Sequence, residues 1–327
     1  MSTPSLQDRL ADDLQDHFKG KPLQEHGPLW NQLWERQNTS WDRGGPSLAL
    51  HEALNYYPEL FDGTYPDLGL LSDFVSHEPD QHASSATGAA TVPRKKALVP
   101  ACGRGYDAVL LAKVFGYDVF GLEISSSALD AARKYLNGVD TVLNAHQAQQ
   151  QQQPSDDNPA MRFWVENQSP SPGHVRWVSG DFFSDDWLVD AGTEQFDLIF
   201  DYTFFCAIPP SSRPKWAARM QQLLAHPNGR LVITYGEKKH SAHQNPGNNI
   251  DQAQRDWSIN AHAGTSTGPG LAMIVRFKPS VTHESGQSYQ GSFGRDWVSV
   301  WGHLLDNGLL KPDTTSEDPN LQVKKND

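Results

Sequence analysis

Three carboxylates in this sequence follow short apolar runs, and a glycine turn follows a fourth such run. Glu123 ends GLE, Asp181 lies in GDFF, Asp201 ends FDLIFD, and Gly103 and Gly105 lie in ACGRGYD. Glycine allows the backbone to approach a ligand closely, and an acid at a strand end can accept hydrogen bonds from two ribose hydroxyls. One such carboxylate often only caps a loop. Their number beside a glycine turn predicts a nucleotide site.

The glycine pattern does not by itself identify the ligand. Gly103, Gly105 and Ala108 have the G-x-G-x-x-A spacing of a dinucleotide site. Glu123 follows about twenty residues later, where such a site places its ribose-binding acid.

Three tryptophans upstream of the turn bear on this choice. Trp30 and Trp34 are four residues apart and share one helical face, and Trp41 follows beside Asp42. An aromatic face near a cation contributes about 0.5–2 kcal/mol. A sulfonium cofactor would use such faces and a dinucleotide would not. Ordinary packing of the indoles is the alternative interpretation.

A strand, a turn, a helix and a second strand must position these groups. Residues 97–100 form the short apolar run typical of a buried parallel strand. The turn follows, and then apolar side chains at helical spacing predict a helix that Gly116 ends. Residues 118–122 predict the second strand, which ends on Glu123.

The rest of the chain repeats this alternation. Strands are predicted at 174–179, 195–201 and 230–235, and a helix from about residue 212 to 225. The order is that of an α/β fold with a doubly wound, mostly parallel sheet, which binds ligands beyond the carboxyl ends of its strands. The Gln-rich composition predicts a disordered insert near 140–172, with a short strand at 161–167 inside it.

The composition restricts the partners and the compartment. The formal net charge of −12 argues against a nucleic-acid partner and against docking on an anionic membrane. No stretch is apolar enough to span a bilayer, and residues 1–20 lack the apolar core of a secretory signal. Cys102 and Cys206 form no disulfide framework, and the histidines lack metal-ligand spacing. We expect a cytoplasmic monomer without a metal.

Five separated motifs resemble one family. The spaced tryptophans, VPACGRGYD, GLEIS, GDFF and FDLIFDYTFFCAI occur in the order found in the thiopurine S-methyltransferase family, closest to its thiol and halide methyltransferase branch. The resemblance extends over roughly residues 26–235. It implies a class I, Rossmann-like enzyme whose cofactor is S-adenosylmethionine. An Arg follows the acid of the fourth strand in the thiopurine branch. Tyr202 stands there in this chain, as in the thiol and halide branch, which favours a small thiol or an inorganic nucleophile as acceptor.

The resemblance also implies roles at matching positions. The tryptophans would line the methionine end of the cofactor, the glycine turn would contact it through the backbone, and the strand-end groups would hold its ribose and adenine. Tyr202 would face the acceptor as the catalytic residue. The residues expected to bind the cofactor are Trp30, Trp34, Trp41, Ala101, Gly103, Glu123, Ile124, Asp181, Phe182 and Asp201.

The C-terminal part of the chain departs from the family pattern. The family closes its sheet with an antiparallel strand pair, which the sequence after residue 236 does not clearly match. Residues 271–279 predict a strand, whereas 296–310 have the spacing of an amphipathic helix. We therefore divide the chain into an N-terminal helical lid (1–60), a cofactor-binding core (61–236) and an atypical C-terminal segment with a polar tail (237–327).

These observations favour an S-adenosylmethionine-dependent methyltransferase that acts on small thiols, with halide or hydrosulfide as further acceptors. Two alternatives stay open. One is a non-catalytic, cofactor-binding paralogue that has lost its acceptor pocket. The other is an NAD-dependent oxidoreductase, which would leave the tryptophans and GDFF without a role.

Overall fold

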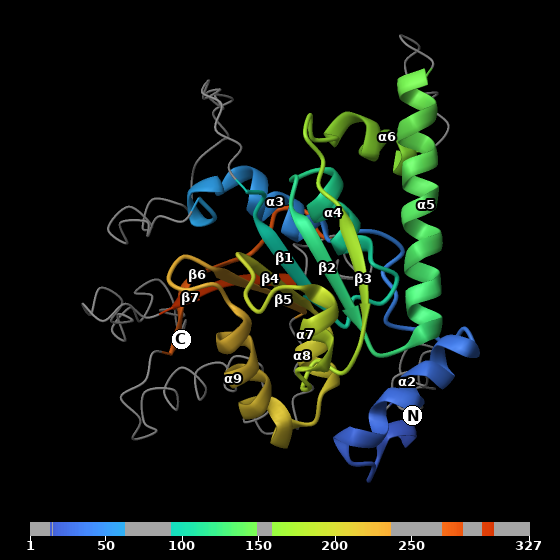
Figure 1. Ribbon diagram of the computed structural model, residues 1–327, viewed down its shortest axis with the longest axis vertical. Coiled ribbons are helices and arrows are strands. Elements are labelled where there is room, and N and C mark those ends of the chain that lie inside the picture. The colour runs from blue at the N-terminus through green and yellow to red at the C-terminus, as the bar shows by residue number, and fades with distance from the viewer. Residues whose placement is uncertain are drawn as a thin grey trace, which may run out of the picture.

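The computed structural model describes residues 14, 16–62, 93–148, 159–236, 270–283 and 296–303. Within these residues one seven-stranded sheet has the order β3-β2-β1-β4-β5-β7-β6 (Figure 1). The strands are β1 (Lys96–Pro100), β2 (Asp118–Glu123), β3 (Val175–Ser179), β4 (Leu198–Tyr202), β5 (Arg230–Gly236), β6 (Leu271–Phe277) and β7 (Asp296–His303).

The first five strands are parallel, and β7 is antiparallel to both β5 and β6. The chain begins in the middle of the sheet, moves outward through β2 to β3, and returns to β4 on the other side of β1. Such a reversal of strand order opens a crevice at the carboxyl ends of the two central strands. The predicted doubly wound, mostly parallel α/β sheet is confirmed.

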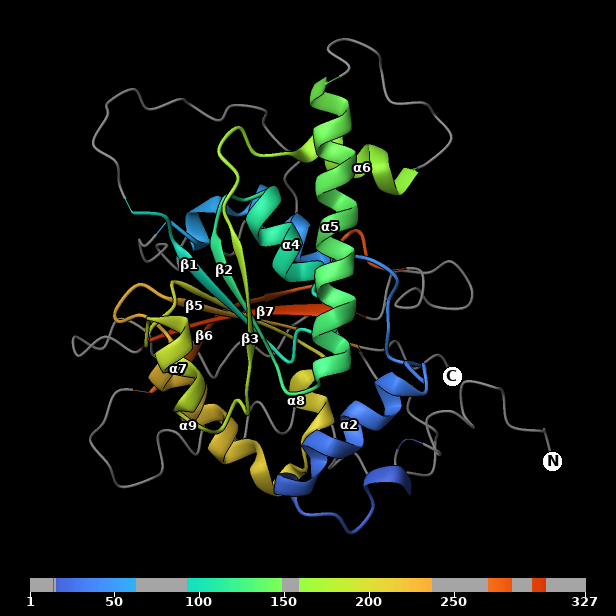
Figure 2. The ribbon, with the colours of Figure 1, turned by 45° about the vertical axis from the view of Figure 1, so that its right-hand side comes forward.

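Helices cover both faces of the sheet (Figures 1 and 2). The side chains of β1 alternate between the two faces of the sheet. Ala97 and Val99 pack into the apolar cluster on one face, and Leu98 packs into the cluster on the other. The first layer contains α3 (Leu48–Tyr56), α4 (Tyr106–Lys113), α5 (Ser126–Ala148) and α6 (Pro159–Asn167). The second contains α7 (Asp186–Ala191), α8 (Phe204–Ala207) and α9 (Arg213–Leu223).

The segment expected to form a lid divides into two parts. Helix α2 (His26–Glu35) lies beside the start of α5 in both views (Figures 1 and 2). Asn31 fixes it there, because its Oδ1 accepts hydrogen bonds from Ser125 Oγ at 2.8 Å and from the Ser127 N–H at 3.2 Å. Helix α3, in contrast, is part of the core, where Leu50 and Ala53 are fully buried.

The expectation of a disordered insert near 140–172 is wrong for the residues that the structure describes. Helix α5 continues to Ala148, and residues 161–167, expected as a strand, lie in helix α6. Buried Val139 and Leu143 of α5 and Trp164 of α6 belong to one apolar cluster, so tertiary packing stabilises both helices. Residues 149–158 lie outside the described part.

The helix expected at 296–310 is also wrong over the part described, since residues 296–303 form strand β7. This strand lies between β5 and β6 and is buried on both faces. A strand covered on both faces has no alternating pattern, and its run of apolar residues resembles a helix by spacing. The predicted strand at 271–279 is confirmed as β6, and β6 with β7 supplies the antiparallel pair that closes the sheet.

Candidate active site

A cavity of about 830 Å³ opens at the carboxyl ends of β1, β2 and β4. Its walls come from the N-terminal segment, the glycine turn and the ends of the strands. The sequence-predicted residues on these walls are Trp30, Trp34, Trp41, Ala101, Gly103, Glu123, Ile124, Asp181, Phe182 and Tyr202. The fold therefore brings together groups from positions 30 to 202 of the chain.

The glycine turn adopts a conformation that favours glycine. Ala101, Gly103 and Gly105 have φ angles of +50°, +54° and +73°. A Cβ atom on Gly103 would lie 3.3 Å from the Trp34 ring, and one on Gly105 would lie 2.2 Å from Trp177. Gly103 thus allows an indole to approach the turn, whereas Gly105 is required by packing against β3.

Glu123 is buried and held by main-chain donors. Its carboxylate accepts N–H groups from Gly103 at 2.9 Å, Ile124 at 2.8 Å and Ser125 at 3.0 Å. Burial raises the pKa of Glu123, and these three bonds act in the opposite direction. A carboxylate has about four acceptor positions, so this side chain is fixed in place and can still accept a hydroxyl.

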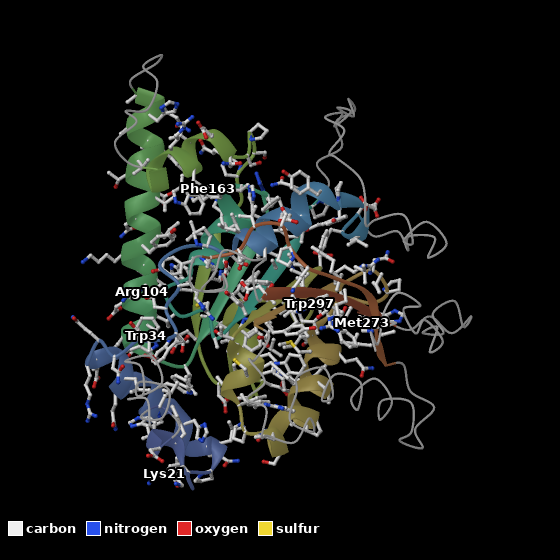
Figure 3. The ribbon with its side chains drawn as sticks, turned by 180° about the vertical axis from the view of Figure 1, so that it is seen from behind. Lys21, Trp34, Arg104, Phe163, Met273 and Trp297 are labelled. Carbon is white, nitrogen blue, oxygen red and sulfur yellow. The ribbon has the colours of Figure 1, made fainter. Side chains whose placement is uncertain are left out.

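The tryptophans form one aromatic cluster on the wall of the cavity. The Trp41 ring centroid lies 5.0 Å from that of Trp30 and 6.0 Å from that of Trp34, with nearly perpendicular planes. The Arg104 guanidinium lies 5.3 Å from the Trp34 ring centroid, and Figure 3 shows both side chains near the end of α2. Arg104 is in turn paired with Asp42. The loop after α2 is therefore tied to the glycine turn.

The segment after β3 forms another part of the wall. Asp181 accepts the N–H of Phe183 at 2.9 Å, and the side chain of Phe182 is buried. Arg219 of α9 fixes this segment by donating to the Phe182 carbonyl at 3.1 Å and to the Ser184 carbonyl at 2.6 Å. This segment is therefore held in one conformation beside the cavity.

Asp201 is not on the cavity wall. Its side chain is fully buried and accepts hydrogen bonds from Trp216 Nε1 at 3.0 Å and from the Phe205 N–H at 3.1 Å. Burial raises its pKa to about 7. The geometry points to a structural carboxylate that joins β4 to α8 and α9, in place of the cofactor contact expected from the sequence.

Tyr202 ends β4 and lines the cavity, and residues of the C-terminal segment contact it. Its hydroxyl donates to Asp296 at 3.4 Å, and its ring stacks on His283 with a centroid separation of 6.0 Å. The Arg43 guanidinium lies 5.6 Å from the Tyr202 ring centroid. Burial raises the pKa of Tyr202, so the phenol is neutral near pH 7.

Two wall residues were not assigned from the sequence. Arg43 follows Trp41 and Asp42 in the sequence, and of these three residues only Trp41 was predicted to bind the cofactor. Asp107 lies in the first turn of α4, where an acid is commonly explained by the helix dipole. Its Oδ1 accepts the Ser47 N–H at 2.6 Å. Arg43 and Asp107 both line the cavity together with Cys206.

A seven-stranded sheet in this order, with a ligand cavity at its carboxyl edge, is the Rossmann-like architecture of class I methyltransferases. The family model described as thiopurine S-methyltransferase matches residues 75–260, more than half of the chain. The chain therefore belongs to the thiopurine S-methyltransferase family, and S-adenosylmethionine is the cofactor that this family uses.

Curated relatives include plant and bacterial proteins. The chain is 30% identical over 203 residues to "Probable thiol methyltransferase 2" of Arabidopsis thaliana, an alignment that covers 62% of this chain and 59% of the relative. It is 31% identical over 216 residues to "Thiocyanate methyltransferase 1" of the same plant, with 66% and 63% covered. A "Thiopurine S-methyltransferase" of Vibrio cholerae is 26% identical over 198 residues, with 55% and 78% covered. The match thus spans about three-fifths of the length of the two plant relatives.

Proposed function

We propose that this protein is an S-adenosylmethionine-dependent S-methyltransferase that acts on small thiols, and on thiocyanate, hydrosulfide or halide as smaller anionic acceptors. The observation that carries the proposal is the joining of Glu123, the Gly103 turn and the Trp30–Trp34–Trp41 cluster around one cavity. The plant relatives named as thiol and thiocyanate methyltransferases support this choice of acceptor.

The residues of the cavity fit S-adenosylmethionine. Glu123 is oriented by three N–H groups and has acceptor capacity for the ribose hydroxyls. Ile124, with 42% of its surface exposed, and Phe182 would contact the adenine, and Asp181 would lie at its edge. The indoles offer aromatic faces to the sulfonium. When bound, the cofactor supplies an electrophilic methyl group.

Methyl transfer from a sulfonium is an in-line displacement, which requires positioning and exclusion of water. The chain supplies both through its N-terminal segment. Asn31 holds α2 on the start of α5, and Asp42 holds the following loop on Arg104 and on Tyr106, whose hydroxyl donates at 3.0 Å. We expect this segment to shield the sulfonium, while Tyr202 and Arg43 border the acceptor.

Two measurements test the proposal. Calorimetry should detect binding of S-adenosylhomocysteine and no binding of NAD. Incubation with S-adenosylmethionine and a panel of thiols, thiocyanate and iodide should produce S-adenosylhomocysteine. Binding without turnover of any acceptor would favour the non-catalytic paralogue, and binding of NAD would favour the oxidoreductase.

The Glu123→Ala variant gives a site-specific prediction. Loss of a charged acceptor that serves two hydroxyls should weaken cofactor binding by about 1–3 kcal/mol. The matched control is Asp130→Ala, since the Asp130 side chain is 78% exposed on α5. Equal affinities of the two variants, both folded by circular dichroism, would remove Glu123 from the site.

A further inference from the structure

Asp107 lines the cavity, and the proposed function assigns no role to its carboxylate. It lies in the first turn of α4, two residues after Gly105, and shares the cavity wall with Tyr202 and Arg43. Its Oδ1 accepts the Ser47 N–H at 2.6 Å, which orients the carboxylate between α4 and the loop before α3. Among the described residues Oδ2 has no hydrogen-bond partner.

We propose that Asp107 is the general base that takes the proton from a thiol acceptor. This inference rests on the proposed function, because it concerns the same cavity. The S–H bond of the thiol breaks, its electron pair stays on sulfur as the thiolate, and the proton passes to Oδ2. The carboxyl group afterwards releases this proton to water. Thiocyanate and iodide carry no proton and do not need this step.

The surroundings of Asp107 suit this role. Burial raises its pKa to about 7, against the effect of the Ser47 N–H. A thiol ionises at about 8.5, and a general base works best when its pKa lies near the operating pH. The carboxylate is therefore ionised in a large part of the molecules at neutral pH and is basic enough to accept the proton.

Among the other titratable groups around this part of the cavity, Asp201 also has a pKa raised to about 7, but it is buried and lies off the cavity wall. Burial raises the pKa of the thiols and phenols, that of Cys206 to about 11, and lowers that of His283 from its usual 6.5. Burial also raises the pKa of Glu123, and the three N–H groups that hydrogen-bond to its carboxylate act in the opposite direction. The remaining neighbours are Cys102, Tyr106, Tyr135 and Tyr202, with Arg43 and the Asp42–Arg104 pair on the same wall.

The proposal predicts opposite pH dependence for the two kinds of acceptor. Ionisation of Asp107 through about pH 7 creates the base for a thiol, so kcat/KM for a thiol should rise there. The same negative charge repels an anion, so kcat/KM for thiocyanate should fall over the same interval. Both changes result from ionisation of Asp107, so a substitution that removes its carboxylate should abolish both.

The experiment compares a thiol with thiocyanate in the wild-type protein and in Asp107→Asn, with Asp130→Asn as the exposed control. Asparagine can still accept the Ser47 N–H but cannot take a proton. The ratio of thiol to thiocyanate kcat/KM should fall roughly a hundredfold or more in Asp107→Asn. In that variant the rise of the thiol rate should move to the ionisation of the thiol itself, at about pH 8.5.

A titration without turnover gives a second readout. In protein with ¹³C-labelled aspartate carboxyl groups, Asp107 and Asp201 should both titrate near pH 7. One of these two resonances should be absent from Asp107→Asn, and both should be present in Asp130→Asn. If thiol and thiocyanate show the same pH dependence in the wild-type protein, or lose activity equally in Asp107→Asn, Asp107 is only a clamp on Ser47. Because Asp201 also titrates near pH 7, the wild-type and Asp201→Asn profiles together decide this even where Asp107→Asn does not fold. Absence of turnover with every acceptor would instead overturn the proposed function.

Discussion

At the scale of single residues, Trp34 is both buried and part of the cavity wall. It is 92% buried, with 8% of its surface exposed, and it lines the cavity at the glycine turn. One part of the indole lies against Arg104, whose guanidinium is 5.3 Å from the ring centroid. The ring is therefore rigid, and any aromatic face that it offers to a ligand is already positioned before binding.

Replacing Trp34 by Leu should weaken S-adenosylmethionine more than S-adenosylhomocysteine. Leucine keeps an apolar side chain and removes the π face, and only the first of the two ligands carries the sulfonium charge. The difference should be about 0.5–2 kcal/mol if the indole faces the sulfur. Calorimetry with both ligands measures it, and the uncharged ligand serves as the control for packing. Equal losses for both would mean that Trp34 contributes packing alone.

At the scale of elements, Asp201 joins three of them. It is at the end of β4, and its carboxylate accepts hydrogen bonds from the first turn of α8 and from Trp216 in α9. Tyr202, the next residue, lies on the cavity wall. Because successive side chains on a strand point to opposite faces, the Asp201 carboxylate points to α8 and α9 and the Tyr202 phenol points to the other layer.

The Asp201→Asn variant should change how stability depends on pH. The folded pKa of Asp201, about 7, lies above the value of about 3.9 for an unfolded aspartate. The folded state thus binds this proton more tightly, and the wild-type protein loses stability as the pH rises from about 4 to about 7. The variant lacks this loss, which is on the order of 2–4 kcal/mol.

Urea unfolding of both proteins at several pH values measures this effect. The stability of Asp201→Asn relative to the wild type should therefore improve steadily towards pH 7, whatever its value in acid. A stability difference that does not vary with pH would show that Asp201 titrates normally in the folded protein.

At the scale of the whole molecule, residues next to the C-terminal strands contact Tyr202 on the cavity wall. Thr282 and His283 follow β6 and Asp296 begins β7, and these residues surround Tyr202 through the Tyr202–Asp296 bond and the stacked histidine. Glu52 of α3 anchors this segment, since its carboxylate accepts the N–H groups of Ser280 and Val281, each at 2.9 Å. The N-terminal helix layer therefore controls the placement of the C-terminal segment.

Replacing Glu52 by Ala should destabilise the protein and loosen the acceptor end of the cavity. The side chain is buried, and its loss leaves two main-chain donors and the Ser280 hydroxyl without their acceptor. We expect a cost of about 2–4 kcal/mol in the free energy of unfolding. The KM of the thiol should rise while cofactor affinity stays close to that of the wild type. Glu194→Ala, on an exposed residue, is the control, and a rise in cofactor Kd as large as that in KM would contradict the local explanation.

The sequence by itself determined the central unit and most of the cofactor side of the cavity. Glycines with positive φ, strand-end acids and short buried strands are local features, and each depends on only a few neighbouring residues. Ten of the eleven residues proposed for the site line one cavity for this reason. Asp201 is the exception, since the spacing that places an acid at a strand end does not say which face its side chain takes.

Only the tertiary structure decided the rest. Residues 161–167, expected as a strand, form part of helix α6 because they pack against α5. Residues 296–303, expected as a helix, form strand β7 because they pair with both β5 and β6. Asp107 became a candidate base through its burial and through Ser47, which is sixty residues away along the chain. Burial and long-range contacts set the chemistry of a carboxylate, and neither can be obtained from the order of residues around it.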